Sequence, residues 1–279
     1  MQPDLVVRSY VTEVRLSFSS TDQNGHAFTM IQPGDFVIVD RDRVIRDFVS
    51  FAHSQDVPLD LLVLVDTSSS MNQQFRRELS DVVQLIAQTD GVADDHLSVV
   101  SFRDLRPTVL CERDCRTMNL ETKLSVLHDG SVTPLYDSVV FAARQLAERG
   151  DQQTRKVAIL FSDGVDTISL ASLSNALDAA VRDDVAIYSV DLSRKPHNAI
   201  GTAVLRALAA NTGGRYFTTD AGTGNVIGAI RDDIHATYTV AYKMPSHTDG
   251  FHQVRILPTH DLGLQFHCRR GYYYSNTEN

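Results

Sequence analysis

The sequence predicts an α/β domain with a doubly wound, mostly parallel sheet, inserted into a small all-β, immunoglobulin-like sandwich. Across residues 57–235, short apolar runs alternate with helical patterns, as they do in βαβ units. Residues 1–56 and 236–275 show instead the apolar–polar alternation that is typical of half-buried strands. Together these flanks hold roughly 95 residues, about the length of one sandwich, whereas neither flank is long enough alone.

The composition is that of an ordinary globular protein and excludes several classes of chain. Of the 279 residues, 43% are hydrophobic and 22% are charged, which excludes a largely disordered chain, a collagen and a coiled coil. The 35 acidic and 26 basic residues give a net charge of −9, so we expect neither a nucleic-acid partner nor binding to an anionic membrane. The longest apolar run, residues 59–65, is far shorter than the ~18–20 residues of a membrane helix, so no membrane insertion is expected.

The two flanking blocks are expected to contain strands without helices. Val14, Leu16 and Phe18 alternate with polar residues and predict the first strand. Further strands are predicted at residues 36–39, 44–51, 237–242, 252–257 and 264–268. Residues 276–279 are expected to form a disordered tail.

The central block is expected to alternate buried strands with amphipathic helices. Runs rich in Val, Ile and Leu predict parallel strands at residues 59–65, 97–102, 157–161 and 185–190, and a short strand is expected at 215–217. Apolar positions at helical spacing predict helices at residues 75–86, 135–146, 173–181, 204–208 and 226–234. Residues 107–111 follow the second strand after a short turn, so we expect them to pair with it in antiparallel fashion. Residues 119–128 would then return the chain to the edge where the first strand ends.

Polar side chains follow the ends of two of the predicted parallel strands. Asp66, Ser68 and Ser70 come directly after the first strand. Asp163 follows the strand at 157–161, and Thr133 lies in the loop that opens the helix before it. Ligands of an open α/β sheet bind outside the carboxyl ends of its strands, so we expect these two carboxylates and three hydroxyls to converge there.

All five side chains supply hard oxygen ligands, the kind that Mg²⁺ prefers, with Mn²⁺ or Ca²⁺ as alternatives. The set contains no Cys or His, which disfavours zinc. Hydroxyls are weak neutral ligands, and a carboxylate that acts through water leaves the metal an open position. An acidic side chain of another molecule would fill that position, so the pattern predicts carboxylate capture rather than bond cleavage.

Other candidate groups carry less chemistry. Asp137 and Asp166 lie near the metal loops, either as residues that support the ligands or as solvated carboxylates, and both interpretations stay open. The ten histidines show no ligand spacing. Neither a Gly-x-Ser-x-Gly elbow nor a Walker phosphate loop occurs, and no His is placed to activate a serine nucleophile.

The three cysteines are too few for a disulfide framework. Cys111 and Cys115 lie about 13 Å apart in an extended chain, so a bridge between them requires a turn. The alternative is three free, mostly buried thiols, and both remain open. The order of strands places this pair at the sheet edge opposite the polar cluster, where both connections to the sandwich are also expected, so neither cysteine is expected to bind the metal.

The polar cluster resembles the metal ion-dependent adhesion site of the von Willebrand factor type A domains, whose motif is Asp-x-Ser-x-Ser followed by a distant Thr and a distant Asp. Asp66, Ser68 and Ser70, then Thr133 and Asp163, match it without departure across residues 57–235. The resemblance implies that the hydroxyls contact the metal directly and that the two aspartates act through water. It also implies that the last helix of the domain can shift when a carboxylate binds.

The flanking segments resemble those of the bacterial VWFA-related proteins that are abundant in Acidobacteria. The similarity rests on residues 22–51 and on the ending Arg269-Arg270-Gly271-Tyr272-Tyr273. Because those proteins are largely expected to be exported, the resemblance favours a periplasmic, secreted or cell-surface location. The first residues do not resemble a signal peptide, which is typical either of a cytoplasmic protein or of a chain that starts at a mature or trimmed boundary.

The sequence and this resemblance together predict a non-enzymatic, metal-dependent, adhesion-like module that captures an Asp or Glu side chain of a protein partner. One alternative is an assembly factor that acts with an AAA+ ATPase, as some type A domain proteins do. A metal-assisted hydrolase is the other, but the sequence offers it no identifiable general base.

Overall fold

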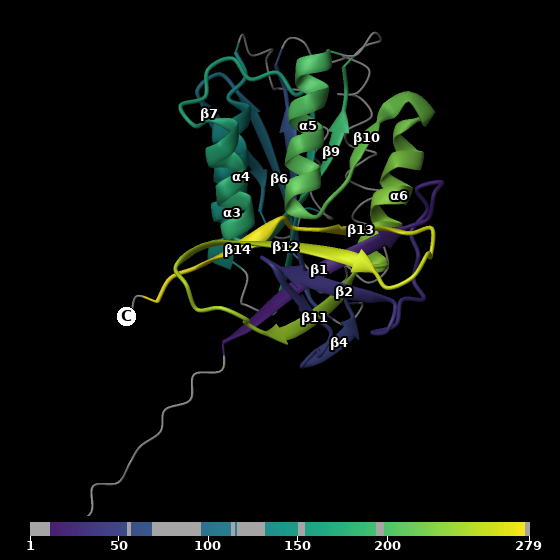
Figure 1. Cartoon of the computed structure of the whole chain (residues 1–279). Coiled ribbons are helices and arrows are strands. Elements are labelled where there is room, and N and C mark those ends of the chain that lie inside the picture. The colour runs from purple at the N-terminus through teal and green to yellow at the C-terminus, as the bar shows by residue number, and fades with distance from the viewer. Residues whose placement is uncertain are drawn as a thin grey trace, which may run out of the picture.

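The computed structural model describes residues 12–54, 57–68, 96–112, 115, 132–149, 154–193 and 198–276. Within them the chain forms an α/β unit and a pair of β-sheets at one end of it (Figure 1). The predicted helix at 75–86, the predicted segment at 119–128 and residues 277–279 of the predicted tail lie outside the described residues.

A six-stranded sheet forms the centre of the α/β unit, in the order β10-β9-β8-β5-β6-β7. Its parallel strands are β5 (Leu59–Asp66), β6 (His96–Arg103), β8 (Arg155–Ser162), β9 (Val185–Asp191) and β10 (Tyr216–Thr218). The edge strand β7 (Arg106–Cys111) runs antiparallel to β6, as predicted. Every residue of β5 is buried, because this central strand is covered on both faces.

Helices cover both faces of the central sheet. α3 (Leu135–Arg149), α4 (Leu173–Arg182) and α5 (Ala199–Thr212) share an apolar core with one face (Figure 1). α6 (Thr223–His235), which follows a short 3-10 turn η2 (Thr219–Ala221), packs on the other face. The predicted helices at 135–146, 173–181, 204–208 and 226–234 are therefore present, and α5 begins earlier than its apolar spacing indicates because Asn198 caps its first turn.

The two remaining sheets are antiparallel and mix strands from both ends of the chain. One has the order β13-β1-β11-β4, formed by β13 (Gln265–Cys268), β1 (Glu13–Thr21), β11 (Tyr238–Lys243) and β4 (Ser50–His53). The other has the order β14-β12-β2-β3, formed by β14 (Gly271–Tyr274), β12 (Gly250–Pro258), β2 (Phe36–Asp40) and β3 (Arg43–Ile45). Their facing side chains form one core, which confirms a sandwich made from the N- and C-terminal segments.

The structure corrects one predicted strand and adds another. Residues 44–51 are not one strand, because the chain leaves β3 in one sheet and enters β4 in the other. Phe48 lies in the connection and stacks on Phe36, with ring centroids 5.0 Å apart, so its apolar character serves the core rather than a strand. β14 was not predicted as a strand at all.

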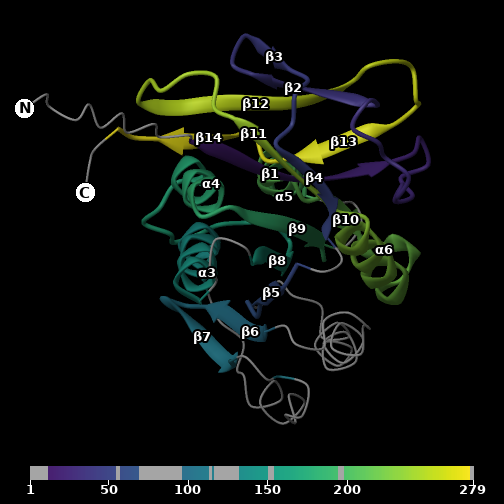
Figure 2. The ribbon, with the colours of Figure 1, turned by 90° about the horizontal axis from the view of Figure 1, so that it is seen from below.

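The sandwich lies against the end of the central sheet where the parallel strands begin. In Figure 2 both of its sheets lie together on one side of the α/β unit. Arg215 of the α/β unit donates to both carboxylate oxygens of Asp233 at 2.7 Å and to the carbonyl oxygen of Gly25 in the sandwich at 2.9 Å. The strand ends that carry the polar cluster therefore lie at the far end from the sandwich, as predicted. The helix α6 is followed directly by β11 of the sandwich. The shift of this helix that the resemblance implies stays a prediction.

Candidate metal centre

Asp66, the last residue of β5, is fully buried. Its Oδ1 accepts a hydrogen bond from the backbone N–H of Ser68 at 2.9 Å, and its Oδ2 accepts one from the hydroxyl of Ser162 at 2.8 Å. Burial, with a smaller contribution from the nearby carboxylate of Asp163, raises the pKa of Asp66 to about 6 against these hydrogen bonds. The fold therefore holds Asp66 in a fixed orientation but leaves its negative charge poorly compensated.

Asp163 follows β8 and begins a tight loop. Its Oδ1 accepts from the backbone N–H of Val165 at 3.0 Å. Gly164 has a φ of +78°, and a Cβ on Gly201 would lie 2.0 Å from the carbonyl oxygen of Asp163. Two glycines therefore allow the first turn of α5 to touch the loop that carries Asp163.

Ser162 joins the two strand ends. Besides donating to Asp66, its hydroxyl oxygen accepts from the backbone N–H of Gly164 at 3.0 Å. The sequence analysis missed this residue, although its place directly before Asp163, as the last residue of a buried strand, is a signal that could have revealed it.

Thr133 lies just before α3 and is only 5% exposed. Its backbone N–H donates to the hydroxyl of Thr167 at 2.7 Å, and its carbonyl oxygen accepts from the backbone N–H of Thr167 at 2.9 Å. Thr167 belongs to the loop that follows Asp163, so the two loops are joined side by side. Within the described part of the chain, the hydroxyl of Thr133 itself makes no hydrogen bond, which leaves its oxygen available to a ligand.

The carboxylates of Asp137 and Asp166 accept hydrogen bonds between the loop after β8 and the start of α3. Asp137 accepts from the backbone N–H groups of Leu170 at 3.0 Å and Ala171 at 2.8 Å. Asp166 accepts from the backbone N–H of Tyr136 at 3.3 Å. Both carboxylates thus attach the loop after β8 to the first turn of α3.

Of the five candidate ligands, Ser68 is described and buried, whereas Ser70 lies outside the described residues. Cys111 and Cys115 form a disulfide with their Cα atoms 5.6 Å apart, which decides between the two alternatives for this pair. Cys268, in the sandwich, is free. The disulfide lies toward the start of the parallel strands, since Cys111 is opposite Val99 and β7 runs away from the polar edge.

The donor set suits a hard divalent cation. Among the described residues, no group of three or more His, Cys, Asp or Glu side chains is close enough to hold a metal, so the hydroxyls would have to join the carboxylates of Asp66 and Asp163. Carboxylate and hydroxyl oxygens fit Mg²⁺, Mn²⁺ or Ca²⁺ and disfavour zinc. A cation here would also compensate the buried charge of Asp66.

The described helices include none that is both long and apolar enough to cross a membrane.

Comparisons with known proteins find a matching family profile and several similar structures. The profile of the von Willebrand factor type A domain matches residues 60–231. The PilB minor pilin from Streptococcus sanguinis, solved as a D319A mutant, has a similar fold with a TM-score of 0.50 and 11% identity, over 64% of this chain and 62% of the pilin. Manganese-loaded TRAP protein from Plasmodium vivax aligns with a TM-score of 0.49 and 14% identity, over 82% of this chain and 100% of TRAP. An aerotolerance-related membrane protein from Bacteroides fragilis aligns with a TM-score of 0.48 and 14% identity, over 63% of this chain and 98% of its own.

A search of curated protein sequences finds no match. The profile match covers more than half of the chain, and the central sheet has the strand arrangement that it implies. The chain therefore belongs to the von Willebrand factor type A domain family.

Proposed function

We propose that this protein is a non-enzymatic, metal-dependent protein-binding module that captures an Asp or Glu side chain of a partner. Domains of this family are typically metal-dependent protein-interaction modules. Ser68, Ser70 and Thr133 would hold Mg²⁺, or Mn²⁺ or Ca²⁺ in its place, with Asp66 and Asp163 assisting through water. When bound, the cation would supply an open position for a carboxylate oxygen of the partner.

The observation that carries this proposal is the uncompensated charge of Asp66. Its carboxylate is buried, is held by Ser68 and Ser162, and lies near the second carboxylate of Asp163. A buried carboxylate beside a second, partly buried carboxylate is unfavourable unless a cation or a proton balances the charge. A divalent cation would balance both charges and still attract a further anionic ligand through its exposed side.

Exposed apolar side chains near the same edge support a protein as the partner. They lie in loops that carry or contact the candidate ligands and in the first turn of α5: Leu105 (72% exposed), Ile168 (38%), Leu170 (98%) and Ile200 (76%). Apolar side chains around a specific polar contact are typical of the buried core of a protein interface. The partner would therefore present an acidic side chain beside apolar residues.

The disulfide between Cys111 and Cys115 supports an extracytoplasmic location. Disulfides persist in oxidising compartments and are rare in the cytoplasm. This chemistry agrees with the exported location that the resemblance favours, and on that basis we expect the partner in the periplasm, on the cell surface or outside the cell.

A metal-dependent pull-down from envelope and soluble fractions tests the proposal. Four samples are compared: wild type with Mg²⁺, wild type with EDTA, Thr133→Val with Mg²⁺, and Thr259→Val with Mg²⁺. Thr259 is an exposed threonine of the sandwich, so Thr259→Val makes the same chemical change away from the metal edge. We expect a partner to be retained only by wild type and Thr259→Val in Mg²⁺, whereas equal retention in all four samples would contradict the proposal.

A further inference from the structure

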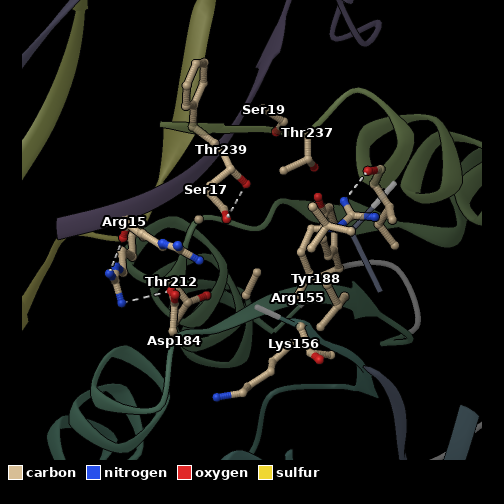
Figure 3. A pocket seen from close by; sticks show the side chains of 18 of the residues that line it. Arg15, Ser17, Ser19, Arg155, Lys156, Asp184, Tyr188, Thr212, Thr237 and Thr239 are labelled. Atoms are coloured by element: carbon tan, nitrogen blue, oxygen red, sulfur yellow. Dashed lines mark hydrogen bonds and ion pairs between the residues drawn. The ribbon is translucent and has the colours of Figure 1, made fainter. Parts of the chain in front are cut away.

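A cavity of about 290 Å³ with a mixed polar and apolar lining lies between the sandwich and the α/β unit, at the opposite end of the molecule from the metal edge (Figure 3). The strands β1 and β11 line its sandwich side, and the starts of β8 and β9 line the other side. Its volume is close to the lower end of the range of small-molecule sites, which is roughly 300 Å³.

The alternation of apolar and polar residues along β1 explains the polar side chains on the sandwich side of the cavity. Val14, Leu16 and Phe18 point into the sandwich core. The intervening residues Arg15 and Ser17 lie on the opposite face, which turns toward the α/β unit and lines the cavity. A face that the sequence pattern alone would assign to solvent therefore lies over a second domain.

The lining carries an excess of positive charge in a chain whose net charge is −9. Four basic side chains contribute to it, Arg15, Arg155, Lys156 and Arg269, against the single acidic side chain of Asp184. That carboxylate is already paired with the guanidinium of Arg269 at 2.9 Å. The side chains of Arg155 and Lys156 donate to the backbone carbonyl oxygens of Ile234 at 2.7 Å and of Asp183 at 3.2 Å.

Arg15 is the basic residue that is most available to a ligand. Its guanidinium forms no hydrogen bond or ion pair with any residue in the described part of the chain, and in Figure 3 it extends from β1 toward the middle of the cavity. Beside it, the hydroxyls of Ser17 and Thr239 lie 3.4 Å apart on paired strands, and the hydroxyl of Thr239 also lies 2.8 Å from that of Ser54. A guanidinium fork next to two hydroxyls is a donor set that matches a carboxylate or phosphate group.

We propose that this cavity binds a small multivalent oxyanion, either a phosphate ester or a di- or tricarboxylate, through Arg15 and the hydroxyls of Ser17 and Thr239. The ligand would contact both the sandwich and the α/β unit, so it would stabilise their mutual arrangement. This site is separate from the metal edge and does not depend on the function proposed for it.

Titration calorimetry and thermal unfolding with two probes, inorganic phosphate and citrate, test this proposal. All samples are first freed of divalent cations on a chelating resin, so that the metal edge does not contribute and no soluble polycarboxylate competes with the probes. Sodium chloride at matched ionic strength provides the baseline. The test variant is Arg15→Gln. The matched control is Arg255→Gln, because Arg255 is an exposed strand arginine on the outer sheet, outside the cavity.

We expect saturable binding of at least one probe at one site per chain, together with a rise in Tm beyond that in chloride. Arg15→Gln should weaken this binding by about tenfold or more, because it removes a charge-assisted hydrogen bond, whereas Arg255→Gln should bind like wild type. Binding of phosphate alone identifies a phosphate ester, and binding of citrate alone identifies a carboxylate ligand. No saturable binding of either probe, or equal affinities in the two variants, would overturn the proposal.

Discussion

His267 is a partly buried side chain whose titration opposes folding in acid. Its Nε2 lies 2.9 Å from the hydroxyl of Thr21. Burial and, to a lesser extent, the charge of Arg215 lower its pKa to about 4 from the ordinary 6.5. Between pH 6.5 and about pH 4 this histidine is therefore protonated in the unfolded chain but neutral in the folded chain. The resulting stability is complete above pH 6.5 and is lost as the pH falls from 6.5 toward 4.

The variant His267→Gln should remove this acid sensitivity. Between pH 7 and pH 4 the free energy of unfolding of wild type should fall by about 3 kcal/mol relative to that of His267→Gln, as measured by urea denaturation. His247, an exposed histidine of the sandwich, offers the control His247→Gln, which should follow wild type. Parallel pH profiles for wild type and His267→Gln would show that the burial of His267 has no such effect.

At the scale of elements, the contact between the start of α5 and the loop after β8 fixes the place of Asp163. A Cβ on Gly201 would lie 2.0 Å from the carbonyl oxygen of Asp163, so Gly201→Ala has to push the loop and the helix apart. We expect a loss of about 1–3 kcal/mol in the free energy of unfolding and weaker metal binding.

Gly228 is the matched control for this change. It lies inside α6, and a Cβ there would meet no atom within 4 Å. Gly228→Ala should therefore stabilise the protein by about 1 kcal/mol, since alanine is the better helix former, and should leave metal binding unchanged. Chemical denaturation of both variants checks the pair, and a Gly201→Ala protein as stable as wild type would contradict the tight contact.

The elements that could be predicted are those whose sequence pattern reflects their own burial. The strand β5 is apolar because both of its faces are covered, and α3, α4 and α6 show the spacing of one buried stripe. Of the candidate site, the sequence predicted that Asp66, Thr133 and Asp163 share one edge, because strand order brings the carboxyl ends of β5 and β8 together.

The elements that escaped prediction depend on partners far away in the chain. Tyr272 of β14 donates to Asp40 at 2.8 Å, across 232 residues, and no local pattern indicates such a bond. Tyr242 donates to the same carboxylate at 3.0 Å. Phe48 looks like part of a strand but fills the core between two sheets. Long-range packing of this kind overrides local propensity.

At the scale of the whole molecule, the segment after β13 joins the two domains. Arg269 pairs with Asp184, and Arg270 pairs with Asp178 on α4. Tyr273 donates to the same carboxylate of Asp178 at 2.9 Å. Consecutive side chains of one short segment thus attach the sandwich to the base of the α/β unit, away from the metal edge.

A double-mutant cycle on Arg270 and Asp178 should reveal this attachment. Arg270→Gln and Asp178→Asn should show a coupling energy of about 1 kcal/mol, because the pair is partly buried and shared with a tyrosine. Arg231 and Asp232 form an exposed control pair, whose coupling should be close to zero. If the coupling between Arg270 and Asp178 were no larger than that of the control pair, this contact would not hold the domains together.

The central claim is that the oxygen ligands at the ends of β5 and β8 hold a divalent cation. The most direct test is to titrate the purified protein with Mn²⁺ and to measure the bound fraction by electron paramagnetic resonance. Wild type and Thr259→Val should bind one Mn²⁺ per chain. Thr133→Val should bind it at least about tenfold more weakly, and Asp66→Asn should lose it, because each removes an oxygen or a charge from the site. A wild-type chain that binds no Mn²⁺, or a Thr133→Val chain that binds it as well as Thr259→Val, would contradict the claim.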